Sequence, residues 1–273
     1  MLADLHTHTN ASDGQLSPTE LLTNAAAAGV DLLAITDHDT ISGIAGLDKN
    51  IAPDCTVIPG IELSTNWRKI GIHIVGLNID PDNTTLLAGI MQQQAARLQR
   101  SQLIAKKLEK LGFKDTLAGA VKLAGDSIIG RPHFARHLVD SGQVKTMKDA
   151  FRKYLGSGKP GDVRDFWAPM EDIIEWIHQA GGSAVLAHPA KYRLTNLKTE
   201  ELTRAFRDQG GDALELISGK QDPTLTTRLG KLARRCGLLA SCGSDFHQPG
   251  QPWAVLGEVA ALPADCTPVW DNW

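Results

Sequence analysis

Short apolar runs alternate with amphipathic stretches along most of this chain, and this alternation restricts the folds that it can adopt. The apolar runs are short and nearly continuous, as in parallel strands that are buried on both faces. Repeated strand-then-helix order predicts parallel strands joined by right-handed crossovers. Six or seven such strands favour an α/β fold with an imperfect β/α barrel over an open sheet. Strands are expected at residues 2–5, 31–36, 56–58, 61–64, 70–77, 183–187, 213–217 and 238–241.

The first helix after a strand has clear boundary signals. Ser17 can cap a helix, Pro18 suits its first turn, and Glu20 completes a capping box. Gly29 is a natural stop. Further helices between strands are expected at residues 170–180, 198–209 and 223–236.

Residues 82–159 interrupt the alternation and contain no strand signal. A long polar helix is expected over residues 92–110, with Leu98, Ile104, Leu108 and Leu111 on one apolar side, and shorter helices at 131–141 and 146–155. We therefore predict a barrel formed by residues 1–81 and 160–273, with residues 82–159 as a helical insertion. Because the insertion follows a strand that carries a candidate ligand, we interpret it as a cap over a site; a peripheral decoration is the alternative.

Composition narrows the functional classes. The 28 Lys and Arg residues and 31 Asp and Glu residues give a net charge of −3, so no globally basic surface for long duplexes is expected. A local cluster of cations can still bind a short anion. The four cysteines form no CxxC pair, and we find neither an apolar leader nor a membrane-length apolar run. These features predict a cytoplasmic protein with reduced, buried thiols and no membrane association.

Most of the nine histidines fall at the ends of expected strands. Barrel enzymes build their sites from side chains at the carboxyl ends of several strands. Five histidines lie in or just after such ends, and a sixth lies within a strand: His6, His8, His38, His188 and His247, and then His73. His137 and His178 are expected to be structural or exposed.

The spacing of several of these residues fits shared ligation of one ion. His6 and His8 are two residues apart, so both imidazoles point to the same side of a strand. Asp13 follows in a Ser-Asp-Gly turn, and Asp245 and His247 repeat the same two-residue spacing near the last strand. A lone His-x-His pair is a weak signal, since buried histidines with ordinary hydrogen bonds also produce it.

Acidic residues and a histidine also lie among apolar residues. Glu62 follows Pro-Gly-Ile, and a buried carboxylate without a partner is costly, so we expect it to bridge two cations. His73 lies in a strongly apolar strand and is read as a ligand rather than a core histidine. Asp37 and Asp39 flank His38; they could orient ligands or cap the following segment.

Together these patterns predict a metal site with nitrogen and oxygen donors and no thiolate. Such a donor set favours Zn, Mn or Fe, and nine ligands would serve two or three ions. Clustered cations polarise phosphoryl oxygens and lower the pKa of bound water, so a hydroxide between two ions would attack phosphorus without a Ser or Cys nucleophile. The nine candidates are His6, His8, Asp13, His38, Glu62, His73, His188, Asp245 and His247.

At these residues the sequence resembles the PHP (polymerase and histidinol phosphatase) family of the amidohydrolase superfamily. The matching blocks are Asp-Leu-His-Thr-His, Ser-Asp-Gly, Ile-Thr-Asp-His-Asp-Thr, Pro-Gly-Ile-Glu, His-Ile-Val-Gly, Ala-His-Pro and Gly-Ser-Asp-Phe-His. The resemblance implies a distorted (β/α)7 barrel and two or three divalent ions, with Mn²⁺ expected first and Zn²⁺ or Fe²⁺ as alternatives.

The resemblance also implies a grouping of the ligands. One ion would take His6, His8, Glu62 and Asp245; a second would take Glu62, His73 and His188; a third would take Asp13, His38 and His247. Glu62, Asp245 and His247 are the expected catalytic residues within this set.

Within the family, the chain is most similar to the 3',5'-nucleotide bisphosphate phosphatases, also described as 5'→3' exoribonucleases acting on short RNA. The similarity continues in Arg131-Pro-His-Phe-Ala-Arg-His and in Tyr-Leu-Gly-Ser-Gly-Lys159-Pro. It implies Arg131, His133 and Lys159 as substrate contacts, because a guanidinium can bind a phosphate with two hydrogen bonds. Two positions depart from the usual pattern. Lys191 replaces an arginine but keeps its charge, so it is expected as a further substrate contact, and Asp162 replaces an aromatic residue.

The expected substrates are 3',5'-bisphosphonucleotides and short single-stranded RNA with a 5'-phosphate, and no protein partner is predicted. One alternative keeps the chemistry and changes the substrate to another small phosphate monoester such as histidinol phosphate. The other alternative is a non-catalytic metal-binding module.

Overall fold

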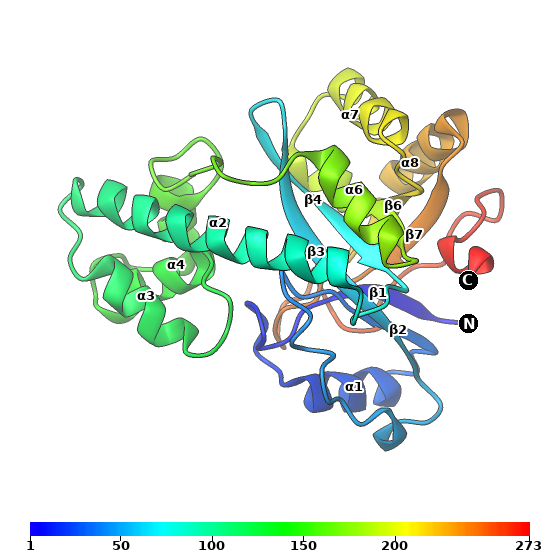
Figure 1. Ribbon diagram of the computed structural model, residues 1–273, viewed down its shortest axis with the longest axis horizontal. Coiled ribbons are helices and arrows are strands. Elements are labelled where there is room, and N and C mark those ends of the chain that lie inside the picture. Colours follow the sequence, from blue (N-terminus) through cyan, green and yellow to red (C-terminus); the bar gives the residue numbers. More distant parts are fainter.

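The computed structural model describes residues 1–273 and contains one seven-stranded sheet whose strands lie in chain order (Figure 1). The strands are β1 (Ala3–Thr7), β2 (Leu32–Ile35), β3 (Thr56–Trp67), β4 (Ile70–Leu77), β5 (Ser183–Leu186), β6 (Ala213–Ser218) and β7 (Leu239–Gly243). The helices are α1 (Pro18–Ala27), α2 (Thr84–Glu109), α3 (Thr116–Ala124), α4 (Arg131–Asp140), α5 (Met147–Ala150), α6 (Met170–Gln179), α7 (Asn196–Asp208) and α8 (Pro223–Cys236). Short turns of helix occur at η1 (Lys49–Ile51), η2 (Phe151–Leu155), η3 (Pro189–Tyr192) and η4 (Val269–Asn272).

The sheet nearly closes on itself, because the segments that follow β1 and β7 contact one another. The His8 amide donates to the Phe246 carbonyl at 2.9 Å, and the Asp245 amide donates to the His6 carbonyl at 2.8 Å. This closure confirms the predicted distorted seven-stranded barrel. It also brings the residues after β1 next to those after β7.

Not all strands are parallel as predicted. β3 pairs with β4, and β4 with β5, in antiparallel register. Only Arg68 and Lys69 connect β3 to β4, and two residues allow a hairpin but no crossover helix. The two predicted strands at 56–58 and 61–64 are one continuous β3, which passes through Pro59 and Gly60.

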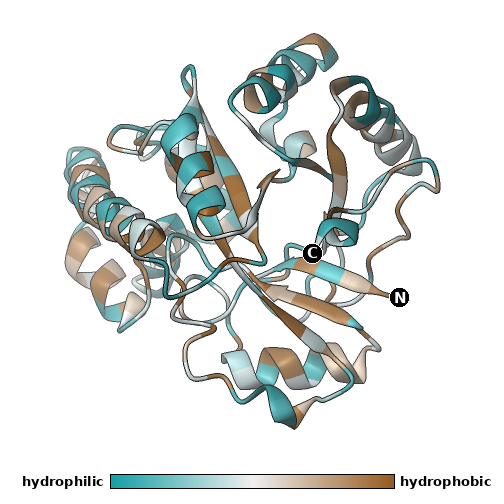
Figure 2. Ribbon diagram, turned by 45° about the vertical axis from the view of Figure 1, so that its right-hand side comes forward, coloured by the Kyte–Doolittle hydropathy of each residue, from teal (hydrophilic) through white to brown (hydrophobic).

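The barrel core is apolar and is enclosed by amphipathic helices (Figure 2). α6 packs on β3, β4 and β5, and α8 packs on β6 and β7. α1 covers a second apolar cluster beside β2 and has the predicted capping box, with the Ser17 amide donating to the Glu20 carboxylate at 2.8 Å. No helix is both long enough and apolar enough to cross a membrane. The four cysteines are buried and unpaired, as predicted.

The helices of the insertion form a lobe beside the barrel, and α2 runs through both (Figure 1). The first turns of α2 lie against the barrel, where a Cβ at Gly89 would come within 2.4 Å of the Trp176 ring. Its later turns join α3, α4 and α5 around a separate apolar cluster that includes Ile104, Leu108 and Phe134. The exact boundaries between the barrel and the insertion, at residues 82 and 159, stay a prediction.

The apolar side predicted for the long helix is only half correct. Ile104 and Leu108 are buried, but Leu98 and Leu111 are 57% and 50% exposed. The buried face instead continues toward the barrel with Arg97 and Arg100, which are both 7% exposed. These two arginines pack there because they find polar partners at the junction between barrel and insertion.

Candidate metal centre

All nine predicted ligands lie in one continuous cluster at the end of the barrel beside the insertion. β1 and its following loop carry His6, His8 and Asp13, and the segment after β2 carries His38. Glu62 and His73 come from the β3–β4 hairpin, and His188 follows β5. Asp245 and His247 follow β7. Residues from six strands therefore meet, as the sequence pattern predicted.

Glu62 lies at the centre of the cluster and is 0% exposed. Its Oε1 is 2.7 Å from His73 Nδ1 and 2.9 Å from His188 Nε2. Its Oε2 is 2.9 Å from His38 Nδ1. One carboxylate thus faces several imidazoles on both of its oxygens, which is the geometry of a group shared between neighbouring cations.

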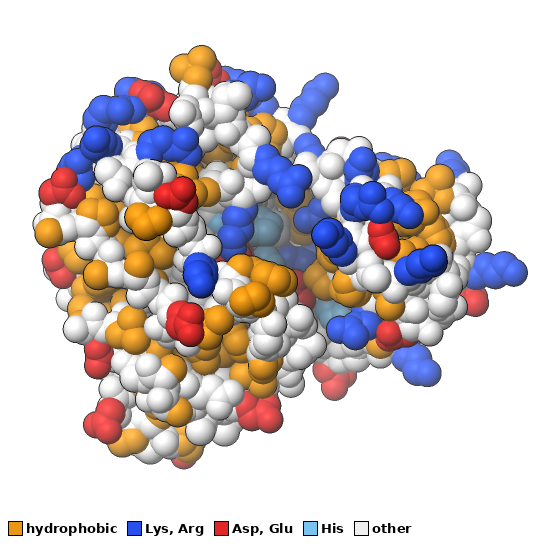
Figure 3. Space-filling model, turned by 180° about the vertical axis from the view of Figure 1, so that it is seen from behind, with side chains coloured by type: hydrophobic (Ala, Val, Ile, Leu, Met, Phe, Trp, Pro, Cys, Tyr) orange, Lys and Arg blue, Asp and Glu red, His pale blue; other side chains and the backbone are white.

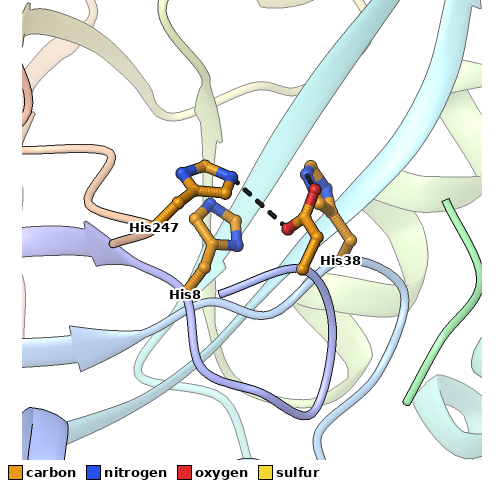
Figure 4. Close-up of side chains that lie close together, drawn as sticks. His8, His38 and His247 are labelled. Carbon is orange, nitrogen blue, oxygen red and sulfur yellow. Dashed lines mark ion pairs between the residues drawn. The ribbon is translucent and has the colours of Figure 1, made fainter. Parts of the chain in front are cut away.

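A second part of the cluster surrounds Asp13 (Figure 4). His247 Nε2 lies 3.3 Å from Asp13 Oδ1, and His38 Nε2 lies 3.8 Å from Asp13 Oδ2. The His8 and His247 rings stack with their centroids 4.1 Å apart. Asp245 connects this part to the centre, with its Oδ1 3.3 Å from His8 Nε2 and 3.7 Å from His6 Nε2.

The hydrogen bonds in the cluster are incomplete. Ten buried side-chain nitrogen or oxygen atoms in the protein have no hydrogen-bond partner, and seven of them belong to predicted ligands. Such orphaned atoms are costly in a protein interior unless another group satisfies them. Divalent cations fit this requirement. The seven atoms are His6 Nε2, His8 Nδ1, His8 Nε2, Asp13 Oδ1, His38 Nδ1, Glu62 Oε2 and His188 Nδ1.

Ligand atoms within 4.8 Å of one another form four overlapping groups. The groups are His8, Asp13, His38 and His247; His6, Glu62 and His188; His6, His8 and Asp245; and His38, Glu62 and His73. The first contains the predicted Asp13 set and adds His8. The overlap of the others agrees with a shared Glu62, while the assignment of each ligand to one ion stays a prediction.

Electrostatics divide the imidazoles into protonated and neutral groups. Burial lowers the pKa of His247, but Asp13 and Asp245 outweigh burial and raise it to about 10. Burial, together with the cations His247 and His38, lowers the pKa of His8 to about 3. Burial raises the pKa of Glu62, but His38 and His73 hold it well below its usual value. In the absence of metal the cluster therefore holds anionic carboxylates beside both neutral and protonated imidazoles, and metal binding would release the protons from the latter.

Glu215 on β6 belongs to the site although the sequence pattern did not single it out. It is 2% exposed, and its Oε1 accepts a hydrogen bond from His6 Nδ1 at 3.0 Å. Its Oε2 accepts from the His188 backbone amide. The first contact leaves the Nε2 lone pair of His6 facing Glu62 and Asp245, so Glu215 holds the orientation of this predicted ligand.

Glu215→Gln is expected to lower divalent-metal affinity by about 10- to 100-fold, because partners that orient ligands contribute at this level. Titration of the metal-free protein against a competing chelator measures the change. Glu171→Gln, an exposed position on α6, serves as the matched control. Equal affinity in both variants would show that Glu215 does not orient His6.

The two aspartates beside His38 have separate tasks, and neither caps a helix. Asp37 accepts hydrogen bonds from the Thr9 hydroxyl at 2.6 Å and the Ser12 hydroxyl at 2.5 Å, and so holds the loop that carries Asp13. Asp39 is fully buried and forms an ion pair with Arg97 at 2.6 Å.

A cavity of about 830 Å³, including its part open to solvent, lies between the ligand cluster and the insertion. Asp13, His38 and His73 line one wall. Four arginines also line it: Arg97, Arg100, Arg131 and Arg164. Figure 3 shows a hollow between the larger and smaller bodies, with histidines inside it and Lys and Arg side chains around it.

The arginines differ in how far they are neutralised. Arg97 is paired with Asp39, and Arg164 with Asp162. Arg131 Nη1 is 3.5 Å from Asp162 and donates to the Leu155 carbonyl at 3.2 Å. Arg100 donates its Nε to the Val163 carbonyl at 2.7 Å and forms no ion pair. Burial, with Arg131 and Arg97 nearby, lowers the pKa of Arg100 to about 9, so an anion beside it is favoured.

The predicted substrate contacts are placed differently from one another. Arg131 lines the cavity. His133 instead caps the start of α4, where its Nδ1 accepts a hydrogen bond from the Gly130 amide at 3.0 Å. Lys159 is exposed and does not line the cavity. Lys191 forms an ion pair with Asp245, a predicted ligand. The substrate roles of these four residues stay predictions.

Comparison with known proteins agrees with this site. Residues 4–184 match the PHP domain. The chain is 45% identical to the 5'-3' exoribonuclease Rnm of Escherichia coli K12, over 100% of this chain and 94% of that protein. The chain belongs to the PHP domain family. This PHP chain is also 42% identical to a 3',5'-nucleoside bisphosphate phosphatase of Chromobacterium violaceum, over 98% of this chain and 94% of that protein.

Solved structures support the same assignment. An amidohydrolase from Chromobacterium violaceum, with bound sulfate and no metal, superposes with a TM-score of 0.90 at 41% identity, covering 100% of this chain and 95% of that one. A candidate metal-dependent phosphoesterase from Bifidobacterium adolescentis gives a TM-score of 0.77 at 28% identity, covering 98% and 93%. The PHP fold and a site suited to divalent metals are thus shared features.

Proposed function

We propose that this PHP protein is a metal-dependent phosphoesterase that hydrolyses the 3'-phosphate of 3',5'-bisphosphonucleotides. It would also remove nucleotides stepwise, 5'→3', from short RNA with a 5'-phosphate. The observation that carries the proposal is a cavity lined by predicted metal ligands on one wall and by Arg100 and Arg131 on another. The similarity to a 5'-3' exoribonuclease and to a 3',5'-nucleoside bisphosphate phosphatase supports the same substrates.

Two or three divalent ions held by the nine ligands would polarise phosphoryl oxygens and lower the pKa of a bound water. We expect Mn²⁺ first, with Zn²⁺ or Fe²⁺ as alternatives, because His and carboxylate donors accept all three. Glu62, Asp245 and His247 are the proposed catalytic residues, since Glu62 lies at the centre of the cluster, Asp245 contacts His8, and His247 contacts Asp13.

The protein's own cavity residues would position the substrate. Arg100 and Arg131 are proposed to bind the 5'-phosphate, because their charges are the least neutralised in the cavity. Both substrates carry a 5'-phosphate beside a 3'-phosphoester. Fixing the first group at the arginines would direct the second toward the ligand cluster, so one site can serve both. Residues 82–159 would then act as a substrate cap. We place the reaction in a reducing compartment such as the cytoplasm, which fits four free buried cysteines.

Arg131→Met is expected to reduce kcat/KM for 3',5'-bisphosphoadenosine by about 10- to 100-fold, because a hydrogen bond to a charged group contributes about 1.5–3 kcal/mol. The same change should alter hydrolysis of 3'-AMP, which has no 5'-phosphate, by less than about threefold. Arg136→Met, an exposed position on the same helix, is the control. Equal losses of kcat/KM for the two nucleotides would show that Arg131 does not bind the 5'-phosphate.

The substrate assignment is tested by supplying Mn²⁺-loaded protein with 3',5'-bisphosphoadenosine, a 5'-phosphorylated oligoribonucleotide or histidinol phosphate. We expect release of phosphate from the first and single nucleotides from the second, with little turnover of the third. Comparable rates on all three would refute the nucleotide specificity. Absence of turnover on any phosphoester by the metal-loaded protein would favour the non-catalytic alternative.

A further inference from the structure

Charge is divided very unequally between the two parts of the chain. Residues 82–159 contain 14 Lys and Arg and only 6 Asp and Glu, a net charge of +8. The remaining residues contain 14 Lys and Arg and 25 Asp and Glu, a net charge of −11. The overall charge of −3 therefore hides a strongly basic insertion on an acidic barrel.

Most cations of the insertion are exposed and have no carboxylate partner. Arg152 is paired with Asp149 at 2.5 Å, while no ion pair forms at Lys145, Lys148 or Lys153. Unpaired cations close together repel one another, so their placement disfavours the free protein. A polyanion bound across them would remove that cost and release its own counterions.

Part of this charge is close in sequence to a residue of the cavity wall. α5 runs without interruption into η2, and Phe151 at their junction lines the cavity. Lys148 precedes Phe151 by three residues, and Lys153 follows it by two, and both are exposed. We call Lys145, Lys148 and Lys153 the basic rim.

The size of the cavity indicates what this rim meets. Its volume of about 830 Å³ includes space open to solvent, and even this whole volume is too small to hold an RNA octamer. The strand beyond the bound nucleotide must therefore leave over the edge of the cavity. Each further nucleotide brings one phosphate, which matches a run of unpaired cations.

We propose that the basic rim binds the RNA strand that continues 3' of the nucleotide in the cavity, an inference that rests on the proposed ribonuclease activity. The rim would therefore distinguish RNA from bisphosphonucleotides. A bisphosphonucleotide ends inside the cavity and does not reach the rim, while an RNA strand crosses it. Chain length, rather than base identity, becomes the property that the rim recognises, because backbone phosphates carry no sequence information.

The test compares K148E/K153E with wild type on 3',5'-bisphosphoadenosine and on a 5'-phosphorylated RNA octamer, both with bound Mn²⁺. We expect kcat/KM for the octamer to fall at least about 10-fold, and kcat/KM for the mononucleotide to stay within about twofold. K49E/K231E, which reverses two exposed barrel lysines, is the matched control and should leave both substrates unchanged. Equal effects of the two double variants, or equal effects on the two substrates, would overturn the proposal.

A binding measurement separates this inference from the proposed function. Fluorescence anisotropy of a labelled octamer with metal-free protein should show weaker binding by K148E/K153E, with a log–log salt slope reduced by about 1.4 if two phosphate contacts are lost. If wild type hydrolyses neither substrate but K148E/K153E still binds the octamer more weakly, the proposed function is wrong and RNA binding by the basic rim is supported. If wild type hydrolyses both substrates and K148E/K153E binds the octamer as tightly as wild type, only the proposed role of the rim is wrong.

Discussion

Glu62→Gln is expected to reduce kcat/KM for 3',5'-bisphosphoadenosine by at least about 10³-fold, the largest loss of activity among single substitutions at the site. The exchange keeps the shape of the side chain and removes its charge. Glu62 contacts His38, His73 and His188 within 2.9 Å, and no other carboxylate in the cluster faces as many imidazoles. Without it, the proposed metal ions would lose a ligand and with it several kcal/mol of the transition-state stabilisation they would supply.

The control is Glu258→Gln, which changes an exposed carboxylate of the barrel. Metal content measured on the purified variants should fall in Glu62→Gln and not in the control, while circular dichroism should show that both are folded. Activity of Glu62→Gln within tenfold of wild type, at full metal content, would contradict a shared role for this carboxylate.

Arg97→Ala is expected to lower the free energy of unfolding by about 3–5 kcal/mol, the usual cost of leaving one member of a buried ion pair without its partner. Asp39 is 0% exposed and has its only ion pair with Arg97, at 2.6 Å. It also accepts from the Ser64 amide at 2.8 Å and the Ser64 hydroxyl at 2.9 Å. Arg97 thus joins α2 of the insertion to the barrel through a largely buried ion pair.

The pH dependence of this effect has a defined sign. Burial raises the pKa of Asp39, but Arg97, the Ser64 amide and His38 together outweigh burial and hold this pKa below its usual value. The pair therefore stabilises the wild type above the unfolded pKa of Asp, about 4, and this stabilisation is lost as pH falls through the folded pKa. In Arg97→Ala the carboxyl can bind a proton instead, so the two proteins should converge on acidification.

Denaturant unfolding at pH 7 and pH 4.5 measures both effects, with Asp39→Asn/Arg97→Met as the reference that removes both charges. The double variant should recover much of the stability lost by Arg97→Ala, because no isolated buried charge remains. A loss below about 1 kcal/mol in Arg97→Ala, or one that is the same at both pH values, would show that the pair does not couple the insertion to the barrel.

The nine predicted ligands could be located from the sequence because a barrel brings strand ends together whatever the exact strand pairing. His8 follows β1 and stacks on His247, which follows β7, because these two strands lie side by side in one nearly closed sheet. Strand direction was a weaker inference: the predicted parallel order overlooked that two residues between β3 and β4 cannot make a crossover.

Glu215 and the cavity arginines were missed for different reasons. Glu215 lies in an apolar strand, as Glu62 does, and the argument that a buried carboxylate needs a partner applies to it equally. Arg97 and Arg100 occupy the same helical phase as Ile104 and Leu108, where apolar residues were expected. Polar side chains in a buried phase were the available signal, but their partners Asp39 and Val163 are distant in sequence, so the contact itself required the fold.

Anomalous X-ray diffraction from crystals of the protein grown with Mn²⁺ tests the central claim most directly. Data collected on both sides of the manganese absorption edge should show two or three anomalous peaks, each within about 2.0–2.2 Å of His nitrogens or carboxylate oxygens from the nine predicted ligands, with Glu62 between two of them. Absence of any peak among these side chains at saturating Mn²⁺ would contradict the account.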